Sequence, residues 1–145
     1  MPSPTDFPAR GKIIEVRGAI AVFQPAGTNY QIHVELSGDA KPEVSTHPIE
    51  CIIRVNARKV YTVPSGGNFI QPIFGPPRII QGRVKFADNN TIVVQAGVPI
   101  VCTLPAADSA IDLSEGQIRV GHMANVVALP GATMQLLSAV TAAAR

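Results

Sequence analysis

The stretch QIHVEL, Gln31 to Leu36, alternates apolar and polar residues along its whole length. Its apolar residues would line one face of an extended strand, and its polar residues, His33 among them, would line the other. Similar short runs recur between turn-forming groups such as Pro25-Ala26-Gly27 and Pro130-Gly131, and no amphipathic helix is predicted anywhere. The sequence therefore predicts an all-β fold of small barrels or a sandwich.

The two halves of the chain carry matching patterns. AIAVFQPAGTNYQIHVEL (Ala19 to Leu36) aligns with TIVVQAGVPIVCTL (Thr91 to Leu104), and IIRVNARKVYTVPSGGNFIQ (Ile52 to Gln71) aligns with QIRVGHMANVVALPGATMQL (Gln117 to Leu136). Because the matches occur in the same order, we predict two divergent copies of one β-barrel or sandwich unit with extended terminal arms. Chance resemblance between β-rich segments is the alternative.

The start of each copy allows two alignments. Pairing Gly11 with Gly82 matches a pattern of glycine, base and strand, but it puts the apolar faces out of phase. Sliding by one residue, so that Ile14 meets Val84, restores the phase, and we prefer this alignment. The scattered aromatic residues, Phe74 among them, are assigned to the core. The predicted core positions of the first copy and their counterparts in the second are Ile20, Ile32, Val34, Leu36, Ile53 and Val55, and Ile92, Ile100, Cys102, Leu104, Ile118 and Val120.

The patterns divide the chain into five segments. Residues 1–9 form an N-terminal arm, 10–71 the first β unit, 72–79 a proline-rich connector, 80–138 the second β unit and 139–145 a C-terminal tail. The boundary follows from QPIFGPPR (Gln71 to Arg78), whose three prolines and one glycine favour a stiff extended connector over a strand in mid-sheet.

Composition limits the classes of partner and compartment. The net charge of +2 provides no broad basic surface, so nothing in the sequence supports a nucleic-acid partner. No long apolar stretch is able to span a membrane, and the start lacks a secretory signal, which predicts a soluble protein made in the cytoplasm. Cys51 and Cys102 each lie in phase with apolar neighbours, which favours two separately buried thiols and a reducing compartment.

Motifs for catalysis, cofactors and metals are missing from the sequence. His33, His47 and His122 lie on a polar face, in a loop and beside a glycine, without a pattern that indicates a nucleophile and its base. The acidic group Asp108, Asp112 and Glu115 lacks the order of a calcium loop and is predicted to be a solvated loop. We therefore expect no enzyme, no cofactor and no metal site.

The tightest basic group is Arg54, Arg58 and Lys59. Arg54 and Arg58 are predicted to lie on one strand face, where they would contact an anion or the carboxylates of a partner. The alternative is a solvated strand edge whose charges discourage wrong pairing.

The second copy offers one family resemblance. Its order of a Gly-x-Val strand, a hairpin, and then EGQIRV before a last apolar strand resembles the small oligonucleotide-binding-type barrels that bind molybdate. This resemblance implies a binding module for a small anion. It supplies no oxyanion ligands and therefore no specific residues.

Long uncharged stretches favour assembly. Residues 60–77, 89–107 and 120–144 contain no Lys, Arg, Asp or Glu, and charged residues make up only 15% of the chain, against about 25% in typical soluble domains. Strands with apolar residues on both faces need a cover beyond their own core. The leading hypothesis is a non-enzymatic structural or assembly protein, a homo-oligomer or a subunit of a virion (capsid or tail).

Overall fold

The described part of the chain is built almost wholly from β-strands, which confirms the all-β prediction. The computed structural model describes residues 3–38, 41–106, 110–113 and 117–137, and the helical element among them is a three-residue 3-10 turn. The elements are η1 (Pro4–Asp6), β1 (Ala9–Arg17), β2 (Ile20–Pro25), β3 (Gln31–Leu36), β4 (Ile49–Val63), β5 (Phe69–Gln71), β6 (Phe74–Gly75), β7 (Ile79–Ala87), β8 (Thr91–Gln95), β9 (Pro99–Thr103), β10 (Ile111–Asp112), β11 (Met123–Ala128) and β12 (Thr133–Leu136).

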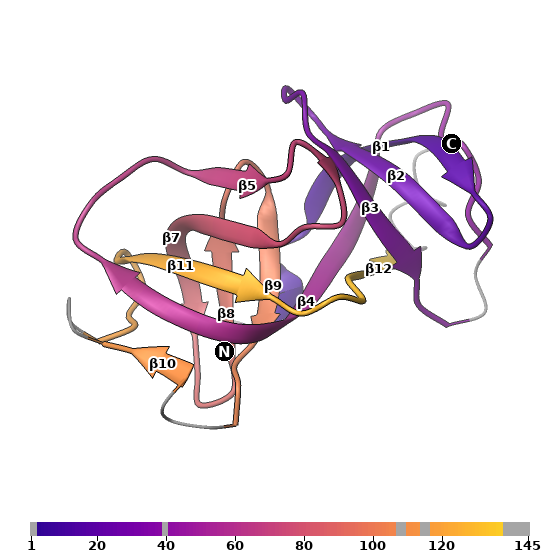
Figure 1. Ribbon diagram of the computed structural model, residues 1–145. Helices are drawn as coiled ribbons and strands as arrows, with labels where there is room; N and C mark the ends of the chain where they lie inside the picture. The colour runs from indigo at the N-terminus through magenta and orange to yellow at the C-terminus, as the bar shows by residue number, and fades with distance from the viewer. Residues whose placement is uncertain (1–2, 39–40, 107–109, 114–116, 138–145) are drawn as a thin grey trace.

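The strands pair into two closed rings that share β4. In the first ring the hydrogen-bonded order is β1, β2, β3, β12, the N-terminal part of β4, and β1 again. In the second ring it is β7, β8, β9, the C-terminal part of β4, β11, and β7 again. Figure 1 shows β4 running from one group of strands to the other. The rings are therefore not consecutive along the chain, because β12 returns to the first ring.

The inward face of β4 changes phase halfway along the strand. Ala57 is buried opposite Ala128 of β11, but the register then shifts and Lys59 lies opposite Val127. Arg58 is the extra residue, so the next inward side chain is that of Val60. One strand thus contributes buried residues to both rings, and a single cluster of buried side chains runs through the two of them.

The first strand of each ring contains a matching bulge. The β1–β2 register shifts between Ile13 and Glu15, and the β7–β8 register shifts between Val84 and Phe86. Ile13 and Val84 are both buried, whereas Ile14 is exposed in the bulge. The predicted match of Ile14 with Val84 is therefore wrong, because the extra residue of the bulge changes the phase that the sequence alignment assumed.

Two glycines occupy equivalent places before these bulges. A Cβ atom on Gly11 would lie 2.2 Å from the carbonyl oxygen of Gln24, and one on Gly82 would lie 1.9 Å from that of Gln95. Neither distance leaves room for a side chain, so both positions need glycine for the close approach of the strands. Gly11 and Gly82 thus stand at the same place relative to the bulges of their own strands.

Most of the predicted core positions lie inside the rings. Fully or almost fully buried are Ile32, Val34, Ile53, Val55, Ile92, Ile100 and Cys102, while Leu36, Leu104 and Ile118 are partly buried against the same core. Val120, however, is 62% exposed and Phe74 is 46% exposed, so their assignment to the core is wrong. Ile20 is also misassigned, because its neighbour Ala21 is the buried residue. These residues lie outside a regular strand or on its outward side.

The structure describes most of the predicted N-terminal arm but none of the predicted C-terminal tail. Of the predicted N-terminal arm, Ala9 already belongs to β1, and Phe7 packs on the outside of the second ring against Phe86, with ring centroids 6.4 Å apart. The predicted C-terminal tail, residues 139–145, lies outside the described residues. None of the described residues forms a helix with the length and apolar character needed to span a bilayer.

Candidate interaction surface

The connector between the two halves forms a rigid hairpin that presents two large apolar side chains. The N–H of Arg78 donates to the carbonyl of Gln71 at 2.8 Å, and the N–H of Gln31 in β3 donates to the carbonyl of Ile73 at 2.7 Å. The backbone is thus fixed at both ends, and the peptide bond before Pro72 is cis. Ile73 is nevertheless 61% exposed.

Phe74 lies beside Ile73 and is flanked by polar groups from two strands. The guanidinium of Arg17 lies 5.2 Å from the centre of the Phe74 ring, and the His33 ring meets it edge-on at 4.5 Å. Glu15 accepts a hydrogen bond from Arg17 and holds the guanidinium in place. A cation over an aromatic face is attractive, and the arrangement leaves part of the ring open to solvent. We call Arg17, Ile73 and Phe74 the connector knob.

His33 was predicted on a polar strand face, and the structure places it there, half-buried beneath Phe74. Its Nε2 atom is buried and has no hydrogen-bond partner among the described residues. Burial lowers the pKa of His33, the charge of Arg17 lowers it further, and Glu15 opposes both effects. These effects together favour the neutral imidazole, which packs against the Phe74 ring.

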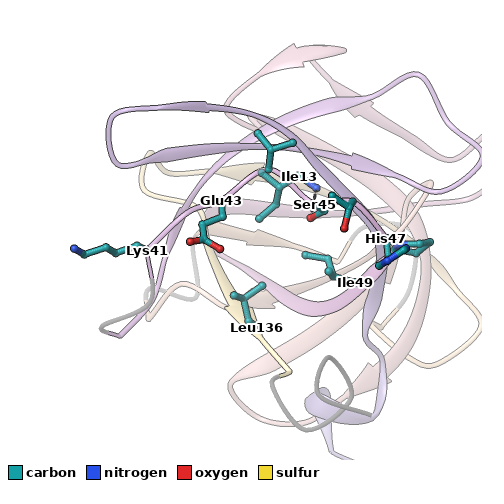
Figure 2. A pocket seen from close by; sticks show the side chains of 10 residues that line it. Ile13, Lys41, Glu43, Ser45, His47, Ile49 and Leu136 are labelled. Carbon is teal, nitrogen blue, oxygen red and sulfur yellow. Dashed lines mark hydrogen bonds between the residues drawn. The ribbon is translucent and has the colours of Figure 1, made fainter. Parts of the chain in front are cut away.

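A second feature is a hollow of about 340 Å³ at the edge of the first ring, under the segment 41–48. Figure 2 shows the side chains of Ile13, Ile49 and Leu136 pointing toward its middle from β1, β4 and β12. Ser45 ties the segment to the bulge of β1, since the N–H of Ile13 donates to Ser45 Oγ at 3.0 Å and the N–H of Ser45 donates to the carbonyl of Ile13 at 2.8 Å. The hollow has an apolar floor and a fixed wall.

The predicted basic group does not form one cluster around a common centre. Arg54 donates a hydrogen bond to the side chain of Gln135 at 2.6 Å, whereas the Lys59 ammonium lies 5.6 Å from the ring centre of Tyr61. Arg58 is exposed in the bulge of β4. Two of the three side chains thus have separate partners, and anion binding by this group stays a prediction.

The remaining polar candidates are distributed over the surface. His47 lines the hollow and is exposed, and His122 is exposed with its Nδ1 atom 3.2 Å from the carbonyl of Gln117. Of the predicted acidic group, Asp108 and Glu115 lie outside the described residues. In the part of the chain that the structure describes, no three potential metal ligands lie together.

The two cysteines lie apart in the core as free thiols, Cys51 in β4 and Cys102 in β9. Burial raises the pKa of Cys51 to about 12, with a smaller contribution from the charge of Glu50. Burial also raises the pKa of Cys102 well above its usual range. A thiol becomes a nucleophile only as the thiolate, so neither sulfur is set up for chemistry.

We expect both thiols to resist a thiol-specific reagent in the folded protein at mildly alkaline pH, and to react rapidly once denaturant unfolds the chain. The Cys51 pKa rises from 9.0 to about 12 on folding, so its contribution to stability is complete below about pH 9 and is lost as the pH rises toward 12. Reaction of either native thiol at the rate of the unfolded protein would contradict this assignment.

Comparison of the chain with models of protein families, with curated proteins and with solved structures found no match.

No pattern in the sequence points directly to the connector knob or to the hollow. The prolines predict the connector, but the usual burial of aromatic residues predicts a core position for Phe74, which the structure contradicts. The available signal was that two large apolar residues, Ile73 and Phe74, stand between prolines in a segment too short to pack both of them inside. The hollow depends on Leu136, which joins Ile13 only through the pairing of distant strands.

Proposed function

We propose that this protein is a non-enzymatic structural or assembly protein whose function is to bind other protein subunits. The observation that carries this proposal is the connector knob, in which Ile73 and Phe74 are exposed on a backbone that is already fixed by hydrogen bonds. An exposed apolar group that is rigid before binding loses little conformational entropy when a partner covers it. Aromatic residues and arginine are also the types that dominate binding energy in protein interfaces.

A homo-oligomer or a larger assembly such as a virion is the setting that fits best. Exposed apolar residues occur in several separate places among the described residues, and the large ones are Ile14, Val44, Ile73, Phe74, Leu113, Val120 and Leu129. Singly such residues are ordinary, but a pair fixed on a stiff hairpin is a feature of contact surfaces. The virion setting rests on the low content of charged residues and on the long uncharged stretches of the chain.

We also propose that the two rings are divergent copies of one small barrel. Each has a glycine before a bulge in its first strand, at Gly11 and Gly82, and each has a segment that hydrogen-bonds to the bulge residue. The N–H of Ser45 donates to the carbonyl of Ile13, and the N–H of Gly121 donates to that of Val84, each at 2.8 Å. Matched hydrogen bonds at matched bulges favour a common origin over chance.

The outward faces of the rings support the same proposal. Val93, on the outside of the second ring, is fully buried in a small cluster that Phe7 covers. Val22 pairs with Glu15 and His33 on the outside of the first ring and is also fully buried, beside the contact of His33 with Phe74. Phe7 precedes the first strand of one ring and Phe74 that of the other, so each ring's leading segment packs on its neighbour.

The assembly proposal predicts that the purified protein associates at micromolar concentration. Sedimentation velocity across a concentration series should show a mass above that of a monomer, and the association should weaken when Phe74 is replaced by Ser, since the knob loses its aromatic ring. A matched control is Leu113→Ser, which removes an apolar side chain of similar exposure elsewhere. A protein that stays monomeric at every concentration and captures no subunit of its own assembly would refute the proposal.

A further inference from the structure

We infer that the connector knob of one copy of this chain docks into the hollow under residues 41–48 of a second copy. The inference rests on the assembly function proposed above and names the partner and the two contacting sites. It starts from two complementary features of one molecule, an exposed apolar projection at Ile73 and Phe74 and an apolar depression floored by Ile13, Ile49 and Leu136.

The second ring indicates which side chain fits the hollow. Ser45 and Gly121 make the same hydrogen bond to the bulge of their ring, and three residues earlier the chain has Pro42 in the first ring and Ile118 in the second. Ile118 packs against the core of its ring. Pro42 is not among the residues that line the hollow, and we infer from this that the first ring lacks the side chain that Ile118 contributes at the corresponding place in the second.

The size of the hollow agrees with an aliphatic or aromatic occupant. Its volume of about 340 Å³ can be compared with an enclosed cavity of roughly 150 Å³ that holds benzene, although this hollow is open to solvent on one side. Ile73 is the more exposed of the two apolar residues of the knob, and its carbonyl accepts a hydrogen bond from Gln31 of β3. Placing it in the hollow would remove apolar surface from water on both copies.

Charges on the two surfaces are complementary. The knob carries Arg17 over the Phe74 ring, and Arg78 closes the same hairpin. Figure 2 shows the Glu43 carboxylate beside the hollow, and Lys41, which also lines it, extends its ammonium group outward. Glu43 forms no ion pair with any described residue. Arg78 on the hairpin of a docked knob would supply its counter-charge and orient the approach, because Arg17 is already paired with Glu15.

A knob and a hollow at different places on one chain produce a head-to-tail contact. Such a contact leaves a free knob at one end and a free hollow at the other, so it propagates into a closed ring or an open filament. A contact between two identical knobs would instead stop at a dimer. The two arrangements respond differently to mutation of the hollow.

The decisive experiment mixes two variants that each lack one half of the contact. Ile73→Asp places a charge on the knob, and Val44→Asp places one on the wall of the hollow at a residue that is 58% exposed, so neither should disturb the core. Each variant alone should be monomeric by sedimentation velocity, with self-association weakened at least roughly tenfold. An equimolar mixture should form a heterodimer and nothing larger, because one functional knob meets one functional hollow.

Val120→Asp is the matched control for Val44→Asp, since Val120 is the exposed valine at the corresponding place in the second ring. It should leave self-association unchanged. If Val44→Asp assembles normally while Ile73→Asp does not, the knob contacts something other than the hollow, and the inference is wrong although the assembly proposal stands. If the unmodified protein associates and neither variant changes it, the inference is likewise wrong. If the unmodified protein is monomeric, copies of the chain do not bind one another, and the inference is wrong.

Discussion

Replacing Ile53 with Ala is expected to lower the free energy of unfolding by roughly 2 to 5 kcal/mol. Ile53 lies in β4 opposite Met134 of β12, and both side chains are fully buried. The substitution would leave a cavity at the point where the first ring closes, and the surrounding strands are held in place by their hydrogen bonds. Chemical denaturation followed by circular dichroism measures the change. The slope of the unfolding free energy against denaturant concentration should stay the same.

The control for Ile53→Ala is Val120→Ala. The sequence alignment treated Val120 as a core residue, but it is exposed, so its replacement should change stability by no more than about 0.5 kcal/mol. Equal losses from the two substitutions would show that Val120 is buried in solution and that the exposed segment before β11 is misplaced. A negligible loss from Ile53→Ala would remove β4 from the core of the first ring.

Replacing Gly82 with Ala is expected to cost about 3 kcal/mol or to prevent folding, because the new methyl group would overlap the backbone of a neighbouring strand. Its Cβ would lie 1.9 Å from the carbonyl oxygen of Gln95, and backbone in a paired strand moves only by breaking the pairing of β7 with β8. The loss is measured by thermal and chemical denaturation. Gly11→Ala should behave in the same way, at the equivalent place in the first ring.

Gly67→Ala is the matched control for Gly82→Ala. Gly67 has no atom within 4 Å of an added Cβ and does not have a left-handed backbone, so alanine should be tolerated there or should slightly stabilise the chain. If Gly82→Ala were as stable as Gly67→Ala, the close approach of β7 and β8 would be incorrect. The proposed equivalence of Gly11 and Gly82 would then lose its main geometric support.

The sequence predicted the strands well because alternation is a local property. QIHVEL forms β3 with Ile32 and Val34 inside, as its alternation predicts. Alignments failed where an extra residue changes the phase, as in the bulge at Ile14. They also failed after β4, because Val120 lies before β11 and not in a strand.

The order of the strands in the sheet could not be predicted from the alternation of apolar and polar residues. Nothing in the local sequence of β12 indicates that it pairs with β3 and with the N-terminal part of β4, since pairing across such a distance depends on the whole chain. That pairing brings Leu136 to the hollow. The hydrogen bond from Gln31 to the carbonyl of Ile73 fixes the backbone in the position that exposes the Ile73 side chain. The sequence therefore predicts an oligomer without identifying its contact surface. The basic group Arg54, Arg58 and Lys59 is the one partner-binding site that the sequence suggests.

The return of β12 to the first ring has a consequence for synthesis on the ribosome. Domains usually fold in the order in which they emerge, N-terminal part first. Here β1, β2, β3 and β4 emerge early, but the edges of β3 and β4 that β12 covers stay unpaired until Thr133–Leu136 has been made, the last of the described strands. Open strand edges are templates for wrong pairing between nascent chains. The first ring therefore completes only after the second ring has been translated. Until then the unpaired edges of β3 and β4 are exposed, and this is the period in which a chaperone would most reduce wrong pairing.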